Sequence, residues 1–169
     1  MTSDRREELK SVHSEVRRCT KCPLHRGRTN AVPGAGPIDA DIMFIGEAPG
    51  FHEDQQGIPF VGRAGQFLNE LLEQAAINRD NVFITNVIKC RPPGNRDPKP
   101  NEVDTCKPYL DQQIELIQPQ VIVTLGRHSM ARAFPNEKIS QVHGQPRRVN
   151  GQIYFPMYHP AAALHQPSL

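Results

Sequence analysis

The sequence lacks any long hydrophobic run. Its longest apolar segments, such as VFITNVI (82–88) and VIVTL (121–125), are far shorter than the roughly 20 residues that a membrane-spanning helix needs. The polar beginning, MTSDRREELK, also lacks the pattern of a secretory signal. These two absences predict a soluble, cytoplasmic protein with no membrane partner.

A large excess of charge of either sign is absent as well. The chain has 20 Lys and Arg against 18 Asp and Glu, so its formal net charge is only +2. No overall positive charge therefore points to nucleic acid, and any basic surface has to be local. With 169 residues, 37% of them hydrophobic, and no internal repeats, the chain is long enough for one compact domain and too short for two. We expect a single domain over residues 1–169, acting as a monomer.

Apolar residues are spaced so that helices alternate with short strands. Leu9, Val12 and Val16 predict an amphipathic helix from about residue 3 to residue 18. Wholly apolar runs predict buried strands, and helical patterns lie between them: strands at 41–45, 82–88, 120–125 and within 152–158, and helices around 67–75, from an Asn101 cap to Ile117, and at 126–134. Strands that are apolar along their whole length and alternate with helices are typical of a parallel sheet with helices on both faces. The sequence therefore predicts an α/β fold.

The predicted strands end in polar or glycine residues. The strand ends read Gly46-Glu47, Thr85-Asn86, Gly126-Arg127 and Tyr158-His159-Pro160. Ligands of open parallel sheets bind beyond the carboxyl ends of the strands. A carboxylate, an amide and an imidazole are therefore expected around one rim, which predicts a ligand site there.

Four cysteines occur in a chain that we expect to be cytoplasmic. Cys19 and Cys22 form a CTKC pair after the first helix, and Cys90 and Cys106 flank the proline-rich loop RPPGNRDPKP (91–100). Disulfides are uncommon in a reducing compartment. A site made of four thiolates fits the count, with either zinc or an iron–sulfur cluster, and the spacing does not separate the two metals. Four ordinary cysteines are the alternative.

Several motifs occur in a fixed order along the chain. They are CTKC (19–22), GEAPG (46–50) with Glu53 and Asp54, GIPFVGRAG (57–65), TNVIKCRPP (85–93) and YHPAAAL (158–164). Over about residues 15–169 this set closely resembles the iron–sulfur, family 4 type of uracil-DNA glycosylase. Similar proteins continue beyond the position of Leu169 into a further helix.

The resemblance implies a three-layer α/β/α fold with a central four-stranded parallel sheet. It also implies a 4Fe-4S cluster and hydrolysis of the N-glycosidic bond between uracil and deoxyribose in DNA. By motif position, the cluster ligands would be Cys19, Cys22, Cys90 and Cys106. The uracil pocket would contain Gly46, Glu47, Phe60, Asn86 and His159, and Glu53 would stand where a methylated base has to fit.

The chemistry of uracil removal suits these residue types. A base buried in a duplex must first be rotated out of the stack. Phe60 offers a ring face for stacking, and Asn86 carries both the acceptor and the donors that the polar edge of uracil needs, whereas cytosine presents the reversed pattern. Thymine differs from uracil only by a methyl group, so it has to be refused by shape, and Glu53 is the expected obstacle.

Breaking the glycosidic bond leaves positive charge on the sugar and negative charge on the departing base. Glu47, as a carboxylate, would stabilise the cationic sugar and orient the attacking water. His159 would donate a hydrogen bond to uracil O2, as neutral imidazole or as imidazolium. Taken alone, Glu47 could equally be a helix or turn cap, Phe60 a core residue and His159 the end of a strand.

Contacts with DNA are expected around the rim of the site. Arg91 and Arg96 lie in the proline-rich loop, where phosphates would meet them, and Leu164 is expected to wedge into the gap left by the extruded base. Relatives that trap DNA covalently carry a histidine-bearing insertion after the second strand. The loop 91–100 has no histidine, so we expect turnover without a lasting protein–DNA bond.

Two other classes of protein remain open from the sequence. One is a non-catalytic DNA-binding module with a structural metal cluster, and the other is a redox or zinc protein that uses only the four cysteines. We expect the cluster to be structural, because its cysteines connect the first helix to the proline-rich loop.

Overall fold

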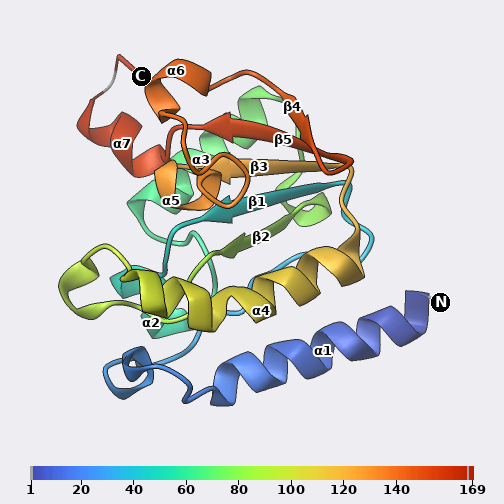
Figure 1. The fold of residues 1–169 in the computed structure, drawn as a ribbon, viewed down its shortest axis with the longest axis vertical. Coiled ribbons are helices and arrows are strands. Elements are labelled where there is room, and N and C mark those ends of the chain that lie inside the picture. Colours follow the sequence, from blue (N-terminus) through green and yellow to red (C-terminus); the bar gives the residue numbers. More distant parts are fainter. Residues whose placement is uncertain (1, 167) are drawn as a thin grey trace.

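The computed structural model of the chain describes residues 2–166 and 168–169. Its centre is a five-stranded sheet in the order β2-β1-β3-β5-β4 (Figure 1). The strands are β1 (Ile42–Gly46), β2 (Phe83–Asn86), β3 (Val121–Leu125), β4 (Arg147–Val149) and β5 (Gln152–Met157). β2, β1, β3 and β5 are parallel, and β4 pairs antiparallel with β5. The predicted α/β fold is confirmed, but the sheet has five strands, not four.

The strand that the sequence pattern missed is β4. It has only three residues, two of them arginines, and none of the three is fully buried. No apolar run marks such a strand. Short edge strands with charged side chains are common because they discourage pairing with other chains.

Helices cover both faces of the sheet. On one face α1 (Thr2–Arg18) and α4 (Pro100–Ile117) pack together, and on the other lies α3 (Arg63–Gln74) (Figure 1). β1 shows how the layers form: Met43 and Ile45 belong to the core under α1 and α4, whereas Phe44 belongs to the core under α3. All three side chains are at most 5% exposed. Alternate side chains of a strand point to opposite faces, so a strand that is apolar throughout needs a helix layer on each side.

The described chain also has four short α-helices: α2 (Phe51–Gln56), α5 (Arg127–Met130), α6 (Ile139–Val142) and α7 (Pro160–His165). α2 lies in the segment after β1, where the sequence pattern predicted no helix, and α5 is shorter than the helix expected at 126–134. The predicted Asn101 cap is wrong. α4 begins one residue earlier, and the backbone N–H of Lys99 donates to the Glu102 carboxylate at 2.8 Å, while proline suits the first helical position.

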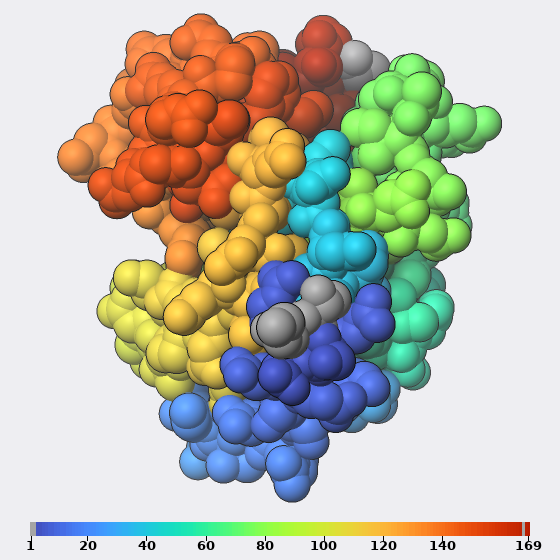
Figure 2. Space-filling model, turned by 90° about the vertical axis from the view of Figure 1, so that its right-hand side faces the viewer, coloured from blue at the N-terminus to red at the C-terminus, as the bar shows by residue number. Residues whose placement is uncertain are grey.

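The two ends of the parallel strands have different surroundings. Where the strands begin, segments around residues 40 (cyan) and 120 (gold) lie side by side (Figure 2), and Gln120 N–H donates to Asp41 O at 2.8 Å. Where the strands end, the loop after β1, the proline-rich loop and the starts of α5 and α7 come together. None of the described helices is long and apolar enough to cross a membrane.

Candidate active site

An open pocket with a volume of about 420 Å³ lies at the carboxyl ends of the strands. Ligand pockets usually measure about 300–1,000 Å³. Among the residues that line it are five that the sequence predicted for the site: Glu47, Glu53, Phe60, Asn86 and His159. The loop after β1, the end of β2 and the start of α7 therefore bring the predicted carboxylate, amide, ring and imidazole into one cavity.

The amide of Asn86 is buried at the end of β2. The residue is 2% exposed, and its Oδ1 atom has no hydrogen-bond partner among the described residues. Gly46 makes this position possible, because a Cβ at residue 46 would lie 2.5 Å from Asn86 Oδ1 and 2.6 Å from Phe60 Cζ. Leaving a buried acceptor unsatisfied costs about 1–3 kcal/mol. A ligand with an N–H donor would remove that cost.

Phe60 stands against His159 in a constrained backbone conformation. The two ring centroids are 5.5 Å apart, and the rings are inclined by 28°. Phe60 has a φ of 52°, in the left-handed region that residues with a side chain seldom adopt. Arg79 holds this turn, donating to Phe60 O at 2.9 Å and to Pro59 O at 2.7 Å. The ring is therefore fixed where it lines the pocket.

One hydrogen bond and the burial of its ring define the protonation state of His159. Its Nδ1 atom accepts the backbone N–H of Ala161 at 3.1 Å, at the start of α7. Burial lowers the pKa of His159 to about 4, and the charge of Glu53 acts in the opposite direction. At neutral pH the ring is therefore uncharged and carries its proton on Nε2. Nε2–H is then the donor that the imidazole can offer to a ligand.

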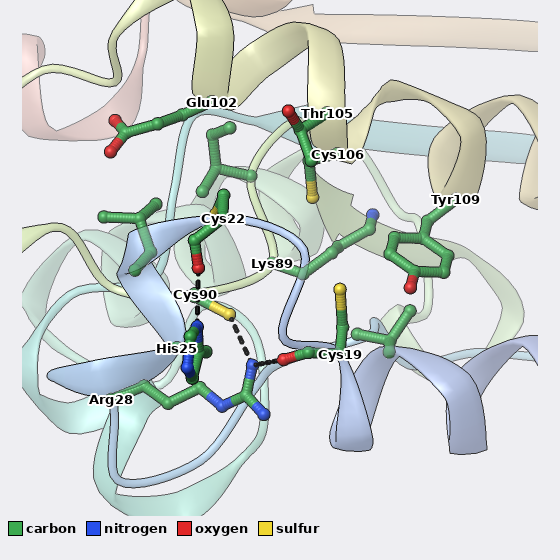
Figure 3. Close-up of a pocket in the computed structure, with 13 residues that line it drawn as sticks. Cys19, Cys22, His25, Arg28, Lys89, Cys90, Glu102, Thr105, Cys106 and Tyr109 are labelled. Carbon is green, nitrogen blue, oxygen red and sulfur yellow. Dashed lines mark hydrogen bonds between the residues drawn. The ribbon is translucent and has the colours of Figure 1, made fainter.

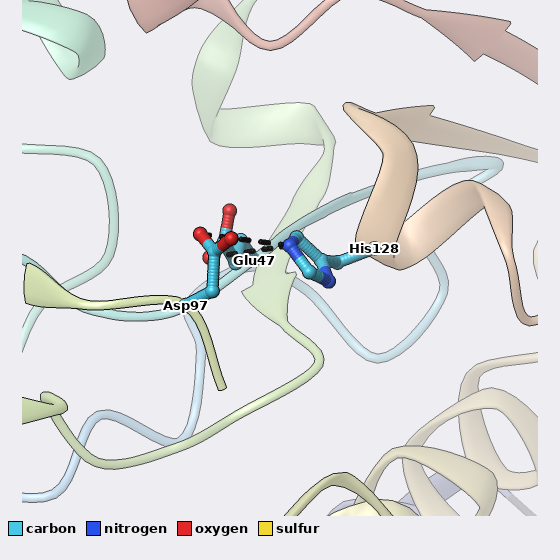
Figure 4. A group of neighbouring side chains, drawn as sticks. All are labelled: Glu47, Asp97 and His128. Carbon is cyan, nitrogen blue, oxygen red and sulfur yellow. Dashed lines mark ion pairs between the residues drawn. The ribbon is translucent and has the colours of Figure 1, made fainter. Parts of the chain in front are cut away.

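Glu47 has two neighbours that the sequence analysis did not identify. His128 Nε2 lies 3.7 Å from both a Glu47 carboxylate oxygen and an Asp97 carboxylate oxygen (Figure 4). Arg127 binds Asp97 from the other side at 2.6 Å. Burial, and then Asp97, raise the pKa of Glu47 to about 7, whereas Arg127 lowers it. Burial lowers the pKa of His128 below its ordinary value.

These three side chains are brought together by tertiary packing alone. Asp97 comes from the proline-rich loop and His128 from α5, directly beyond the strand end at Gly126. The rule that placed the site at strand ends could have found His128, but nothing local marked Asp97. Among the described residues they are the one group of three or more His, Cys, Asp or Glu whose ligand atoms lie within 4.8 Å of one another.

Glu53 braces the loop that surrounds the pocket. Its carboxylate accepts the backbone N–H groups of Gly50 at 3.0 Å, Val61 at 2.9 Å and Gly62 at 2.8 Å. These bonds join the start of α2 to the segment that carries Phe60. Its expected role as the obstacle to thymine stays a prediction.

The residues expected to contact DNA surround the same pocket. Arg96 lines it, but its guanidinium is held by both oxygens of Glu102, at 2.8 and 2.9 Å. Arg91 donates from Nε to Asn95 at 2.7 Å. Leu164 is half-buried on α7. Their contacts with DNA stay predictions.

The four cysteines line a second pocket, between the end of α1, the segment after β2 and α4 (Figure 3). Arg28 crosses it, donating to Cys90 Sγ at 3.2 Å and to Cys19 O at 2.7 Å. Burial raises the pKa of the Cys106 thiol to about 11. The donor set and the neighbouring guanidinium suit a metal centre bound by thiolates.

The cysteine sulfurs are not closely gathered in this structure. Tetrahedral zinc with Zn–S bonds of about 2.3 Å places its sulfurs roughly 3.8 Å apart. Within residues 2–166 and 168–169, no three cysteine sulfurs lie within 4.8 Å of one another. The thiol side chains would therefore have to close in to bind one zinc ion.

A buried lysine connects the two pockets. Lys89 lines the cysteine pocket and is 1% exposed. Its Nζ atom donates to Thr85 Oγ1 at 2.6 Å, to Asn86 O at 2.7 Å and to Gln113 Oε1 at 2.7 Å. Burial lowers its pKa to about 7. The strand end that presents Asn86 is thus anchored by a residue adjacent to Cys90.

Comparison with known proteins agrees with this geometry. Residues 33–169 match the model of the uracil DNA glycosylase superfamily. A type-4 uracil-DNA glycosylase of Sulfurisphaera tokodaii is 49% identical, with 96% of this chain and 79% of that protein covered. The type-4 enzymes of Thermotoga maritima and Archaeoglobus fulgidus are 47% and 45% identical, over 96% of this chain and 87% and 86% of their own lengths. The chain therefore belongs to the uracil-DNA glycosylase superfamily and, within it, to the type-4 uracil-DNA glycosylases.

Proposed function

We propose that this protein excises uracil from DNA by hydrolysing the N-glycosidic bond, releasing free uracil and leaving an abasic site for base-excision repair. The observation that carries the proposal is the buried Asn86 Oδ1 atom without a protein partner, in a pocket whose other walls include Phe60, His159 and Glu47. The substrate is a nucleotide rotated out of uracil-containing DNA. The pocket is complete within one chain, which supports action as a monomer.

Recognition rests on the polar edge of the base. Asn86 Oδ1 accepts uracil N3–H and its amide nitrogen donates to O4, whereas cytosine would place donor against donor and acceptor against acceptor. Phe60 supplies the stacking surface, worth about 1–3 kcal/mol for any base. Discrimination therefore comes from Asn86, and Glu53 restricts the space where the methyl group of thymine would lie.

Bond cleavage uses the two ionisable groups in complementary states. Neutral His159 donates from Nε2 to uracil O2 as negative charge develops on the departing base. Glu47, once ionised, stabilises the cationic sugar and orients the attacking water. Because the pKa of Glu47 is about 7, the rate of excision rises with pH through neutrality.

The cysteine pocket is proposed to hold a 4Fe-4S cluster through Cys19, Cys22, Cys90 and Cys106. Four cysteines lining one pocket support such a cluster, since thiolates are its usual ligands. Arg28 and Lys89, which also line this pocket, would offset the negative charge of four thiolates. When bound, the cluster would link the segment after α1, the segment after β2 and helix α4, and it would take no part in hydrolysis.

The central experiment is release of uracil from an end-labelled oligonucleotide that contains one uracil, followed by alkaline cleavage at the abasic site. A strand with thymine at the same position is the matched control. Glu47→Ala should still bind the uracil strand and lose turnover. Binding without turnover by the unmodified protein would instead identify a non-catalytic DNA-binding module.

The cofactor is tested separately by visible absorption and metal analysis. A brown protein with about four iron atoms per chain is expected, and Cys19→Ala should lose colour and stability together. A colourless preparation that contains zinc would refute the cluster, and a folded, fully active Cys19→Ala protein would refute its structural role.

A further inference from the structure

An aromatic side chain lies exposed beside the active-site pocket. Phe51, the first residue of α2, is 51% exposed, whereas Phe60 is 5% exposed. Its chain neighbours Gly50 and His52 both line the pocket. Scattered exposed hydrophobic residues are common, so the meaning of Phe51 depends on what lies around it.

A cation lies over the ring of Phe51. The guanidinium carbon of Arg91 is 5.4 Å from the ring centroid, and the His52 ring meets the Phe51 ring edge-on at 5.3 Å. Arg91 Nε is fixed by Asn95 at 2.7 Å. Its two terminal nitrogens make no hydrogen bond within the part of the chain that the structure describes. The guanidinium is therefore oriented by the protein and still has donors for a ligand.

The pair joins the two loops that border the pocket. Phe51 follows the loop after β1, and Arg91 begins the proline-rich loop after β2. An aromatic ring beside an oriented cation suits one ligand chemistry well, which is a nucleobase with its phosphate. Protein-binding patches are instead contiguous apolar surfaces of several hundred Å².

We propose that Phe51 and Arg91 form a platform for the nucleotide that adjoins the extruded uracil: its unpaired base stacks on Phe51, and Arg91 binds its phosphate. The inference rests on the proposed function and adds a preference for substrates. In a paired duplex the adjoining base is already stacked on its neighbours, so the platform favours uracil in single-stranded or frayed DNA.

The chain contains no tryptophan, so Phe51→Trp introduces a single fluorescent reporter. We would place it in the Glu47→Gln background, to prevent turnover, and titrate it with single-stranded oligonucleotides that contain one uracil. Stacking should quench the fluorescence. Strands in which an abasic analogue replaces the nucleotide on the 5′ or the 3′ side of uracil should abolish the quenching for one of the two positions.

Ile58→Trp, in the same background, is the matched control. Ile58 is 45% exposed and is absent from the pocket lining, so its reporter should not respond to the missing base. Equal quenching of both reporters, or quenching at residue 51 that ignores both abasic positions, would overturn the platform. If the reporter at residue 51 responded to no oligonucleotide, the platform would also be refuted, and binding of a protein partner would be the remaining explanation for this exposed surface.

The rate of uracil excision provides an independent test of the platform. Phe51→Ala should lower kcat/KM on single-stranded uracil DNA by about tenfold or more, with a much smaller loss on a fully paired duplex, whereas Phe51→Tyr should retain activity. Ile58→Ala should match the parent. Equal losses on both substrates would show a structural role and refute the proposal. If the parent excised no uracil but quenching still followed the adjoining base, the platform would stand and the proposed function would fail.

Discussion

Replacing Glu47 by glutamine should separate what the carboxylate does for catalysis from what it does to the fold. In the folded protein its pKa is raised from 4.5 to about 7. The folded state therefore binds the proton more tightly than the unfolded state, and the fold loses stability as the pH rises from 4.5 to 7. Below this window both states are protonated and nothing is lost, and above it the loss is complete.

The size of the effect follows from the two pKa values. They differ by about 2.5, which at 1.36 kcal/mol for each pKa unit is about 3.4 kcal/mol. The Glu47 side chain is 30% exposed, so screening by solvent reduces the effect to about 1–2 kcal/mol. Glutamine resembles the protonated carboxyl group and does not ionise. Glu47→Gln should therefore be more stable than the parent by this amount at pH 8, and by only about a quarter of it at pH 5.

Urea unfolding followed by circular dichroism at pH 5 and pH 8 measures this difference, and uracil release is assayed on the same samples. We expect the variant to gain stability at pH 8 while its turnover falls by about a hundredfold or more. Glu70→Gln, on the exposed face of α3, is the matched control and should show neither change. A Glu47→Gln protein that is no more stable than the parent at pH 8 would refute the reasoning.

Three further predictions concern neighbouring residues. Asp97→Asn removes a negative charge that helps to raise the pKa of Glu47, so the midpoint of the pH–rate profile should move to lower pH, and an unchanged midpoint would contradict this coupling. Gly46→Ala would place a Cβ 2.5 Å from Asn86 Oδ1, so kcat/KM for uracil release should fall by about 5- to 150-fold, the equivalent of about 1–3 kcal/mol. An unaffected rate would show that the amide does not hold the base there. Lys89→Met leaves three buried acceptors without the donor that now binds them. It should lower the free energy of unfolding, measured in urea, by about 2–4 kcal/mol. A change below about 0.5 kcal/mol, the range of ordinary surface substitutions, would contradict this prediction.

The positions of the main site residues could be predicted because they follow strands that are easy to recognise. Glu47, Asn86 and His159 each come at or just beyond the end of an apolar run. Parallel strands end at the same edge of a sheet. Their meeting in one pocket therefore follows from the topology of the sheet, without any knowledge of side-chain packing.

The surroundings of Glu47 could not be predicted in this way. Asp97 lies in a loop whose prolines indicate a bend but not its direction, and His128 lies on a four-residue helix with no periodicity of its own. Both approach Glu47 only through tertiary packing. The polar network of Lys89 was hidden for a related reason, since one lysine within TNVIKC looks like a solvent-exposed interruption until Gln113 of α4 is placed against it.

Only Val87, Ile88 and Lys89 separate Asn86, which we propose reads the base, from Cys90, which we propose binds the cluster. So short a tether cannot absorb a displacement at one end without passing it to the other. A displacement of Cys90 should consequently also displace Asn86, and with it the contact proposed to select the base.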